Sequence, residues 1–550
     1  MIRRGRESIV FLPRRRRFLP VLDLRARFSH FSLSLTSPSG RNLITNVVKL
    51  GDSSVGAGIR RVAEKRSTYT FRLRSAFEVC ALAFLIVLPP LRGTPPPEGE
   101  LEKGRIIPRV ECRDDRGESY ALYLPSGYDP AKAWPVLVLF DSGARGELAA
   151  NAFRQGAERR GFILAGSNTA RNGPWEPIIR AARAVVRDVA GRFTIDAGRL
   201  YAAGFSGGAR AASLFSKMIE KPVAGLIGCG AGLAPSTPPS QIKPSVYVGT
   251  VGDADFNFQE VRSLDAALDE AGVLHRIFYF EGRHDWPAPD LCARTLDWLD
   301  VAAMASGARP KDEAFLNEVF AREVQEAETL AGAGRGSQAA DACDAILAFF
   351  GGLLDTSALA AKTARLKESK DFERGRKEDR KRAELESATA AGFRDGLRAI
   401  AEIPALGPEL LRIRSGLRIG IWKSEAASGP TPEDRALAAR LLFQLALDAG
   451  RLGREAYRQK AMGKAAALLE IAADACPPRA GPYPYFLFDY ARVLALTGDK
   501  DKALDYLELA VAAGFSDAGE LESEEDFKSI RDTPRFRDLL AKLKSRLPDD

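Results

Sequence analysis

The chain has 550 residues, more than a single hydrophobic core usually serves, so its length predicts two or three domains. Its formal net charge is +8, but residues 1–75 carry 15 Arg and 2 Lys against 4 acidic residues, which leaves a net charge of −5 for the remainder. That balance excludes the basic face of a typical nucleic-acid-binding domain, and the Arg-rich start has no aromatic interleaving, so we expect no nucleic-acid partner.

The start of the chain does not show the pattern of a folded domain. Residues 1–75 lack sustained helical or strand periodicity, and we expect them to be disordered or to precede the true start of the native protein. At the end of this stretch Arg72 and Arg74 precede an apolar run over residues 80–91. A Pro-rich linker follows the run and ends at residue 104. Residues 76–104 therefore predict a signal peptide or an uncleaved membrane anchor, and with it a periplasmic or secreted protein.

The cysteines indicate neither a metal site nor a disulfide framework. The six are widely spaced and contain no Cys-x-x-Cys pair. We therefore expect no metal and no cofactor, and we interpret Cys229, in GLIGCGAGL, as a small buried residue.

From residue 105 short apolar runs alternate with longer helical patterns. The runs RIIPRVEC and SYALYLP flank the turn DDRGE and predict a β-hairpin. Further strands are predicted at PVLVLF, GFILAG, RLYAAG, VAGLIG, SVYVGT and HRIFYF. Helices are predicted near 147–160 and 176–193, from 207, near 258–271 and over 290–305. Near-continuous apolar strands spaced by helices are typical of a mainly parallel, doubly wound sheet, so residues 105–306 are expected to form one α/β domain.

The remainder of the chain is expected to be helical. Residues 307–430 form a linking region in which the charged segment 361–386 predicts a solvated helix. Within 431–550, YARVLALTGDKDKALDYLELAVAAGF spaces the small residues Ala491, Gly498, Ala503 and Ala510 at offsets 0, 7, 12 and 19. KAAALLEIAADACP matches the first three offsets with Ala465, Ala472 and Pro477. This spacing resembles the tetratricopeptide repeat, with EEDFKSIRDTPRFRDLLAKL as a closing segment; the alternative is an Ala-rich two-helix hairpin.

The stretch YAAGFSGGARAASL contains a candidate nucleophile. Ser206 lies at the turn between the predicted strand RLYAAG and the predicted helix that follows, which is the setting of a nucleophile elbow. Such a turn favours Gly204 and Gly208, because a side chain at either position would collide with neighbouring backbone. The N–H of Gly207 opens the helix and is expected to point toward an oxyanion on the substrate.

A serine hydroxyl needs a base to accept its proton, and the chain contains three histidines. His30 lies in the excluded start, and His275 heads an apolar run where a structural role is expected. His284, in FEGRHDWPAPD, follows the last predicted strand in a loop that can reach over the sheet edge. His284 is therefore the predicted base, against the alternative of an ordinary loop histidine.

A carboxylate must orient the imidazole, and the loop VGDADFNFQEV provides two candidates. Asp253 has the usual distance from the start of the preceding strand, and Asp255 follows Gly252 by three residues. We favour Asp255 and retain Asp253 as the alternative; the other acid is expected to hydrogen-bond the turn.

The order nucleophile, acid, base resembles the α/β-hydrolase superfamily, especially its secreted esterase and polyester-depolymerase-like branch. The resemblance covers residues 105–305 and rests on YLPSGYDPAKAWPVLVLF, GFSGG, the Asp-bearing loop and GRHDWP. It implies ester hydrolysis through an acyl-enzyme without a metal.

One feature departs from that superfamily. Where His-Gly commonly follows the strand PVLVLF, this chain has Asp141, Ser142, Gly143, Ala144 and Arg145. A carboxylate beside a developing oxyanion opposes catalysis, so Asp141 must point away for the site to work. Ser142 or Gly143 is expected to provide the second oxyanion donor.

Three further residues are candidates for the substrate rim. Arg145 is expected either to bind an acidic group of the substrate or to be a solvated loop residue. Trp175 and Trp286 are expected either to line the rim or to serve packing alone.

These patterns predict a serine hydrolase, most simply a carboxylesterase acting on a small or polymeric ester. Two alternatives remain. A serine peptidase of the same fold would use the same triad. A scaffold would bind protein partners through the helical repeats and carry an inactive or weakly active hydrolase domain.

Overall fold

The computed structural model describes residues 101–218, 223–242, 246–404 and 406–545. Contacts divide the chain into two units, Met1–Ala81 and Leu82–Asp550, and every described residue belongs to the second. The predicted disordered start, the apolar run 80–91 and His30 therefore lie outside the described residues. Among the described helices none is long and apolar enough to cross a membrane.

Eight strands form one sheet in the order β1-β2-β4-β3-β5-β6-β7-β8. β2 pairs antiparallel with both β1 and β4, and the remaining neighbours pair in parallel. The predicted hairpin and the predicted mainly parallel sheet are confirmed. The strands are Ile106–Glu111, Ser119–Tyr123, Trp134–Asp141, Ile163–Ser167, Ile195–Phe205, Gly225–Cys229, Val246–Gly252 and His275–Phe280, from β1 to β8.

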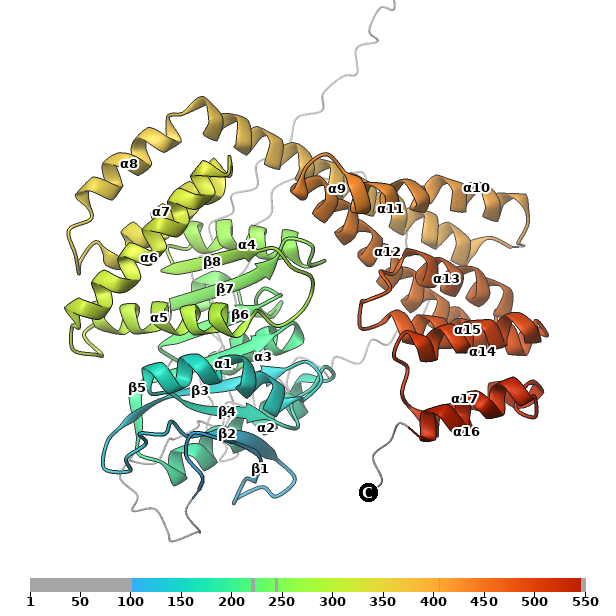
Figure 1. Cartoon of the computed structure of the whole chain (residues 1–550), viewed down its shortest axis with the longest axis horizontal. Helices are drawn as coiled ribbons and strands as arrows, with labels where there is room; N and C mark the ends of the chain where they lie inside the picture. The colour runs from blue at the N-terminus through green and yellow to red at the C-terminus, as the bar shows by residue number, and fades with distance from the viewer. Residues whose placement is uncertain (1–100, 219–222, 243–245, 405, 546–550) are drawn as a thin grey trace, which may run out of the picture. The chain divides into compact units, whose positions relative to one another are not determined.

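Helices cover both faces of the sheet (Figure 1), and the side chains on both faces are buried, as the continuous apolar strands require. Because side chains alternate along a strand, Val136 and Val138 of β3 enter one core, whereas Leu137 and Leu139 enter the other. Helices α2 to α4 contribute to the first core, and α1 and α5 contribute to the second. These helices are Gly146–Arg160, Trp175–Arg192, Gly207–Ser216, Phe258–Glu270 and Pro289–Ala305, from α1 to α5.

The second core continues beyond α5 into the helices that follow it. Trp298 of α5 is fully buried, and its ring centroid lies 4.6 Å from that of Phe349 and 6.0 Å from that of Phe350. Both phenylalanines belong to α7 (Gly336–Phe350), which packs beside α6 (Glu313–Gly332), and α8 is Ser357–Lys367. The first helices after residue 306 are thus part of the sheet's own core.

The remaining helices share a third core. They are Lys370–Glu402, Pro408–Leu417, Ile419–Ser428, Pro432–Arg458, Met462–Ala475, Tyr483–Thr497, Lys500–Ala512, Ala518–Ser523 and Pro534–Lys544, from α9 to α17 in order. α14 and α15 form a hairpin whose turn places Gly498 at φ +91°, a conformation that favours glycine. The helical character of this region is as predicted, and its assignment to tetratricopeptide repeats stays a prediction.

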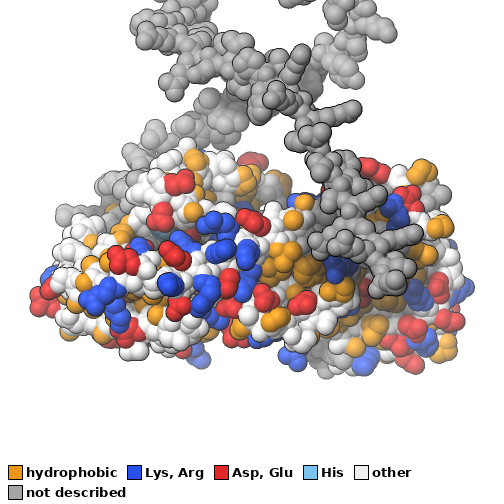
Figure 2. Space-filling model, turned by 90° about the horizontal axis from the view of Figure 1, so that it is seen from above, with side chains coloured by type: hydrophobic (Ala, Val, Ile, Leu, Met, Phe, Trp, Pro, Cys, Tyr) orange, Lys and Arg blue, Asp and Glu red, His pale blue; other side chains and the backbone are white. Residues whose placement is uncertain are grey.

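The charged segment 361–386 spans the end of α8 and the first half of α9. Most of its side chains are exposed, but Glu386 is buried. The face at the top edge of Figure 1 carries interspersed basic and acidic side chains, as Figure 2 shows. That mixture lacks the single-sign field expected of a nucleic-acid-binding surface.

Candidate active site

Ser206 stands at a strained turn between β5 and α3. Its φ of 57° and ψ of −120° are rare for a residue with a side chain, and such strain is characteristic of functional sites. The flanking glycines make the turn sterically feasible. A Cβ on Gly204 would lie 2.2 Å from the backbone of Gly208, and one on Gly208 would lie 2.0 Å from the carbonyl oxygen of Phe140.

His284 bridges Ser206 and Asp255. The loop after β8 places His284 Nε2 2.9 Å from Ser206 Oγ, and Nδ1 lies 2.8 Å and 2.9 Å from the two carboxylate oxygens of Asp255. An ionised carboxylate only accepts hydrogen bonds, so Nδ1 donates to Asp255 and Nε2 is left to accept from the serine hydroxyl. The side chain of Asp255 is 1% exposed and that of His284 is 16% exposed.

The other acid of the loop serves the turn. Asp253 Oδ1 accepts from Gly282 N at 3.1 Å, and the N–H of Asp253 donates to Phe280 O at 2.8 Å. Burial raises the pKa of the Asp253 carboxyl, an effect partly offset by the backbone hydrogen bonds that it accepts. Asp253 therefore ties the β7 loop to the β8 loop, whereas Asp255 faces the imidazole.

Two aromatic rings pack against the imidazole. The ring centroid of His284 lies 4.6 Å from that of Phe205 and 4.3 Å from that of Phe256. Phe256 in turn lies 5.3 Å from Phe443 of α12. A residue of the helical region is thus separated from the candidate base by one ring, a contact for which the sequence carries no local signal.

The carboxylate of Asp141 is fully engaged by its neighbours. Arg145 donates from Nε at 2.7 Å and from Nη2 at 3.0 Å, and Trp286 Nε1 donates at 2.9 Å. Gly143 N completes the set at 2.8 Å. Burial would raise the pKa of the Asp141 carboxyl, but the hydrogen bonds from Arg145, Trp286 and Gly143 outweigh it and lower the pKa.

The oxyanion candidates are backbone N–H groups at the start of α3 and in the loop after β3. Gly207 N is the first N–H of that helix and has no intrahelical acceptor. Gly143 N already donates to Asp141, so of the two residues expected to supply a second donor only Ser142 is left for that role. Asn172, which no sequence motif marks, is close to Gly207: a Cβ added to Gly207 would lie 1.7 Å from Asn172 Oδ1.

The remaining residues that the sequence brought into question are two tryptophans, one histidine and one cysteine. Trp286 lies 5.4 Å from Phe205 between ring centroids and donates to Asp141, whereas Trp175 is 41% exposed at the start of α2. His275 lies away from the site, with Nδ1 2.8 Å from Val273 O and Nε2 3.0 Å from Asp265 Oδ1. Cys229 is buried, and burial raises its pKa to about 12. Over the described ranges no three His, Cys, Asp or Glu side chains gather as a metal site would require.

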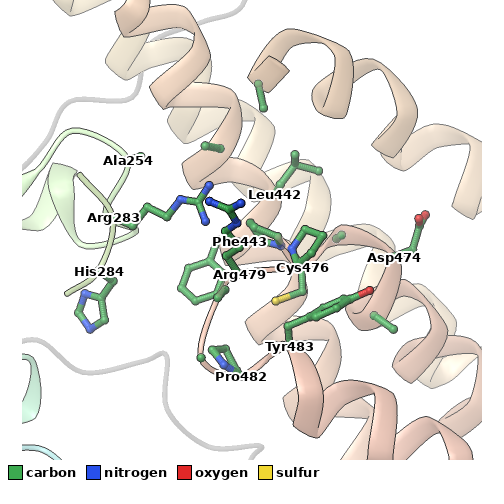
Figure 3. A pocket seen from close by; sticks show the side chains of 18 of the residues that line it. Ala254, Arg283, His284, Leu442, Phe443, Asp474, Cys476, Arg479, Pro482 and Tyr483 are labelled. Atoms are coloured by element: carbon green, nitrogen blue, oxygen red, sulfur yellow. The ribbon is translucent and has the colours of Figure 1, made fainter. Parts of the chain in front are cut away.

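A cavity of about 1100 Å³ opens beside these residues (Figure 3). One wall is made by the loops of the sheet domain and includes Ser142, Phe205 and His284. The other wall is made by α10 to α15 and the loop between α13 and α14, including Phe443 and Tyr483. The helical region therefore supplies most of the residues that line the candidate active-site pocket.

A buried arginine fixes the helical wall to the loop that carries Asp255. Arg440 of α12 is 5% exposed and donates to both carboxylate oxygens of Glu386, at 2.8 Å and 2.6 Å. It also donates to the backbone oxygen of Asp253, and its guanidinium lies 4.4 Å from the ring centroid of Phe258. Its distance from the motif in sequence left no local signal by which it could have been found.

Comparison with protein-family models and with curated proteins finds no match. Among solved structures, the chain is similar to Thermogutta terrifontis esterase 2 phosphorylated by paraoxon, at 18% identity over 36% of this chain and 91% of that one, with a TM-score of 0.29. It is also similar to esterase B from Lactobacillus rhamnosis, at 16% identity over 37% and 90% of the two chains, with a TM-score of 0.31.

Proposed function

We propose that the chain is a serine hydrolase, and specifically a carboxylesterase that works through an acyl-enzyme. The observation that carries the proposal is the unbroken hydrogen-bond path from Ser206 through His284 to Asp255, with Ser206 held in a strained backbone conformation. Nucleophile, base and orienting acid each lie at hydrogen-bond distance, which is the geometric criterion for such a triad.

In the first half-reaction His284 Nε2 accepts the hydroxyl proton while Ser206 Oγ bonds to the acyl carbon. The carbonyl π electrons move onto the oxygen, and the N–H groups of Gly207 and Ser142 are the proposed donors to that oxyanion. Collapse of the intermediate breaks the bond to the alcohol, which leaves with the proton from His284.

Water then attacks the acyl-serine and transfers its proton to His284, and the acid is released as the serine regains its proton. Throughout, Asp255 accepts the hydrogen bond from Nδ1 and stabilises the imidazolium. The engagement of Asp141 by Arg145, Trp286 and Gly143 supports this role for the site, because a free carboxylate near the oxyanion would oppose it.

Labelling with a fluorophosphonate probe tests the nucleophile. We expect the full chain to be labelled and Ser206→Ala to be unlabelled. Ser523→Ala, an exposed serine on α16 whose hydroxyl donates to Gly519 O, is the matched control and should label like the wild type. Absence of labelling in the wild type would contradict the proposal and favour a scaffold whose helices bind protein partners.

A panel of chromogenic esters and aminoacyl amides separates an esterase from a peptidase. The proposal expects turnover of the esters at a higher kcat/KM than the amides. Preference for the amides would replace the carboxylesterase with a serine peptidase that uses the same three residues.

A further inference from the structure

The cavity beside His284 contains an unbalanced positive charge. Two basic residues on its helical wall are neutralised locally: Arg414 Nη1 lies 2.5 Å from Glu470 Oε2, and Lys423 Nζ lies 2.5 Å from Asp474 Oδ1. On the sheet side Arg145 is held by Asp141. These three cations are therefore engaged by acids of the protein.

Two further arginines line the same cavity without such a partner. In the part of the chain that the structure describes, the side chains of Arg283 and Arg479 make no ion pair or hydrogen bond. In Figure 3 both side chains point into the space between the two walls. Like charges in one concavity repel each other and focus a positive potential into it.

The two arginines belong to opposite walls. Arg283 immediately precedes His284, so its Cα lies about 3.8 Å from that of the candidate base. Arg479 lies in the loop between α13 and α14. An anion held between the two arginines would lie in the same cavity as the imidazole of His284.

The chemistry of the two groups indicates the kind of ligand. Guanidinium groups bind carboxylates through paired N–H donors and keep their charge at every physiological pH. One further acid, Asp285, lines the cavity and is exposed. Together with the hydrogen bond to Asp141, its charge helps to raise the pKa of the Arg145 guanidinium. A cavity of about 1100 Å³ is also larger than a short neutral ester fills.

We propose that the ester substrate carries a carboxylate away from the scissile bond and that Arg283 and Arg479 bind it. This inference rests on the proposed esterase function and adds the class of substrate. It assigns to the helical region the role of a specificity wall, because one of the two cationic groups comes from the loop between its helices.

Matched ester series test the proposal with the full chain. The mono-p-nitrophenyl esters of glutaric, adipic and suberic acid are compared with p-nitrophenyl pentanoate, hexanoate and octanoate, in which a methyl group replaces the carboxylate. A second pair, 4-carboxyphenyl butyrate and phenyl butyrate, places the carboxylate on the alcohol. In at least one pair we expect the wild type to prefer the anionic ester, with a preference that falls as NaCl is raised.

Substitution of the arginines assigns that preference. Arg283→Gln and Arg479→Gln should each lower the anionic-to-neutral ratio of kcat/KM by about fivefold, the size expected for exposed charge pairs. Arg283→Lys should retain most of the ratio. Arg412→Gln is the control, because this exposed arginine of α10 pairs with Glu409 outside the cavity, and both rates should stay unchanged.

Binding to Ser206→Ala separates this proposal from the esterase proposal. Calorimetry with the same ester pairs should show tighter binding of the anionic ester and a loss of that difference in the two Gln variants, whether or not the wild type turns over. Equal binding and equal kcat/KM for the members of every pair would overturn the anion site. Tight binding without turnover would retain the anion site and refute the esterase.

Discussion

Arg440 joins α12 to the loop that carries Asp253 and Asp255, and we expect Arg440→Met to be strongly destabilising. The substitution leaves the carboxylate of Glu386 buried, with Gln259 Nε2 at 2.7 Å as its remaining donor among the described contacts. It also removes the hydrogen bond to the backbone oxygen of Asp253 and the contact with the ring of Phe258.

The magnitude follows from the burial of both partners. The side chains of Arg440 and Glu386 are 6% and 11% exposed, so the pair is screened little by solvent. Removing one member of a buried pair costs about 3–5 kcal/mol, because the other charge is left uncompensated. Replacing both members by apolar residues costs far less, and Arg440→Met with Glu386→Leu should lie within about 2 kcal/mol of the wild type.

Urea denaturation of the full-length variants measures these free energies. Arg458→Met is the control on the same helix, because its ion pair with Glu455 is exposed and should change the free energy of unfolding by less than about 0.5 kcal/mol. The reasoning is refuted if the double variant is as unstable as Arg440→Met, or if Arg440→Met costs less than about 1 kcal/mol. Because Arg440 also positions the loop of Asp255, kcat/KM for an ester should fall about 10- to 100-fold.

Three other substitutions test separate parts of the account. Asp255→Asn should lower kcat/KM by about 10⁴-fold, whereas Asp253→Asn should lower it less than about tenfold, since that side chain bonds the turn; equal losses would contradict this division. Gly208→Ala should lower the melting temperature and cost about 1–3 kcal/mol, because its Cβ would meet the carbonyl oxygen of Phe140, and an unchanged melting temperature would refute the close approach. The pKa of Asp141 is lower in the folded protein than in the unfolded chain. Its contribution to the free energy of unfolding is therefore fully present above the usual carboxyl pKa and is lost as the pH falls through the pKa of the folded state. Asp141→Asn should therefore be less stable than the wild type at pH 7, with a gap in unfolding free energy that narrows below about pH 4; a constant gap would contradict the charge argument.

The sequence was most informative where the chemistry is local. The strand, the turn and the helix around Ser206 are formed by adjacent residues. Glycine is required at 204 and 208 because a Cβ at either position would collide with neighbouring backbone atoms. The loop position of His284 was likewise visible, because it follows an apolar run. The positions of the strands and helices were predicted from the same kind of short-range pattern, whereas the order of the strands in the sheet came from the structure.

The choice between Asp253 and Asp255 needed the structure. Both acids lie in one short loop, and the backbone path after β7 decides which carboxylate turns toward the imidazole and which turns toward Gly282. Asp141 presented a similar problem, since the side chains that hold it include Trp286 from a distant loop.

The helical wall of the pocket was beyond sequence reasoning. Phe443, Arg440 and Arg479 lie far along the chain from the catalytic motifs. The sequence around each of them predicts only an amphipathic helix or a loop. Only tertiary packing brings them to the cavity. The spacing of small residues predicted helix hairpins, which the structure contains, but gave no indication that they would line the candidate active site.

Trapping of an acyl-enzyme tests the central claim most directly. The full-length protein is mixed with a p-nitrophenyl ester, quenched in acid within the first turnover and digested, and the peptide masses are measured. The account predicts one acylated peptide, the one that contains Ser206, and its disappearance in Ser206→Ala. Acylation at another residue, or rapid turnover with no acyl adduct on the peptide, would contradict it.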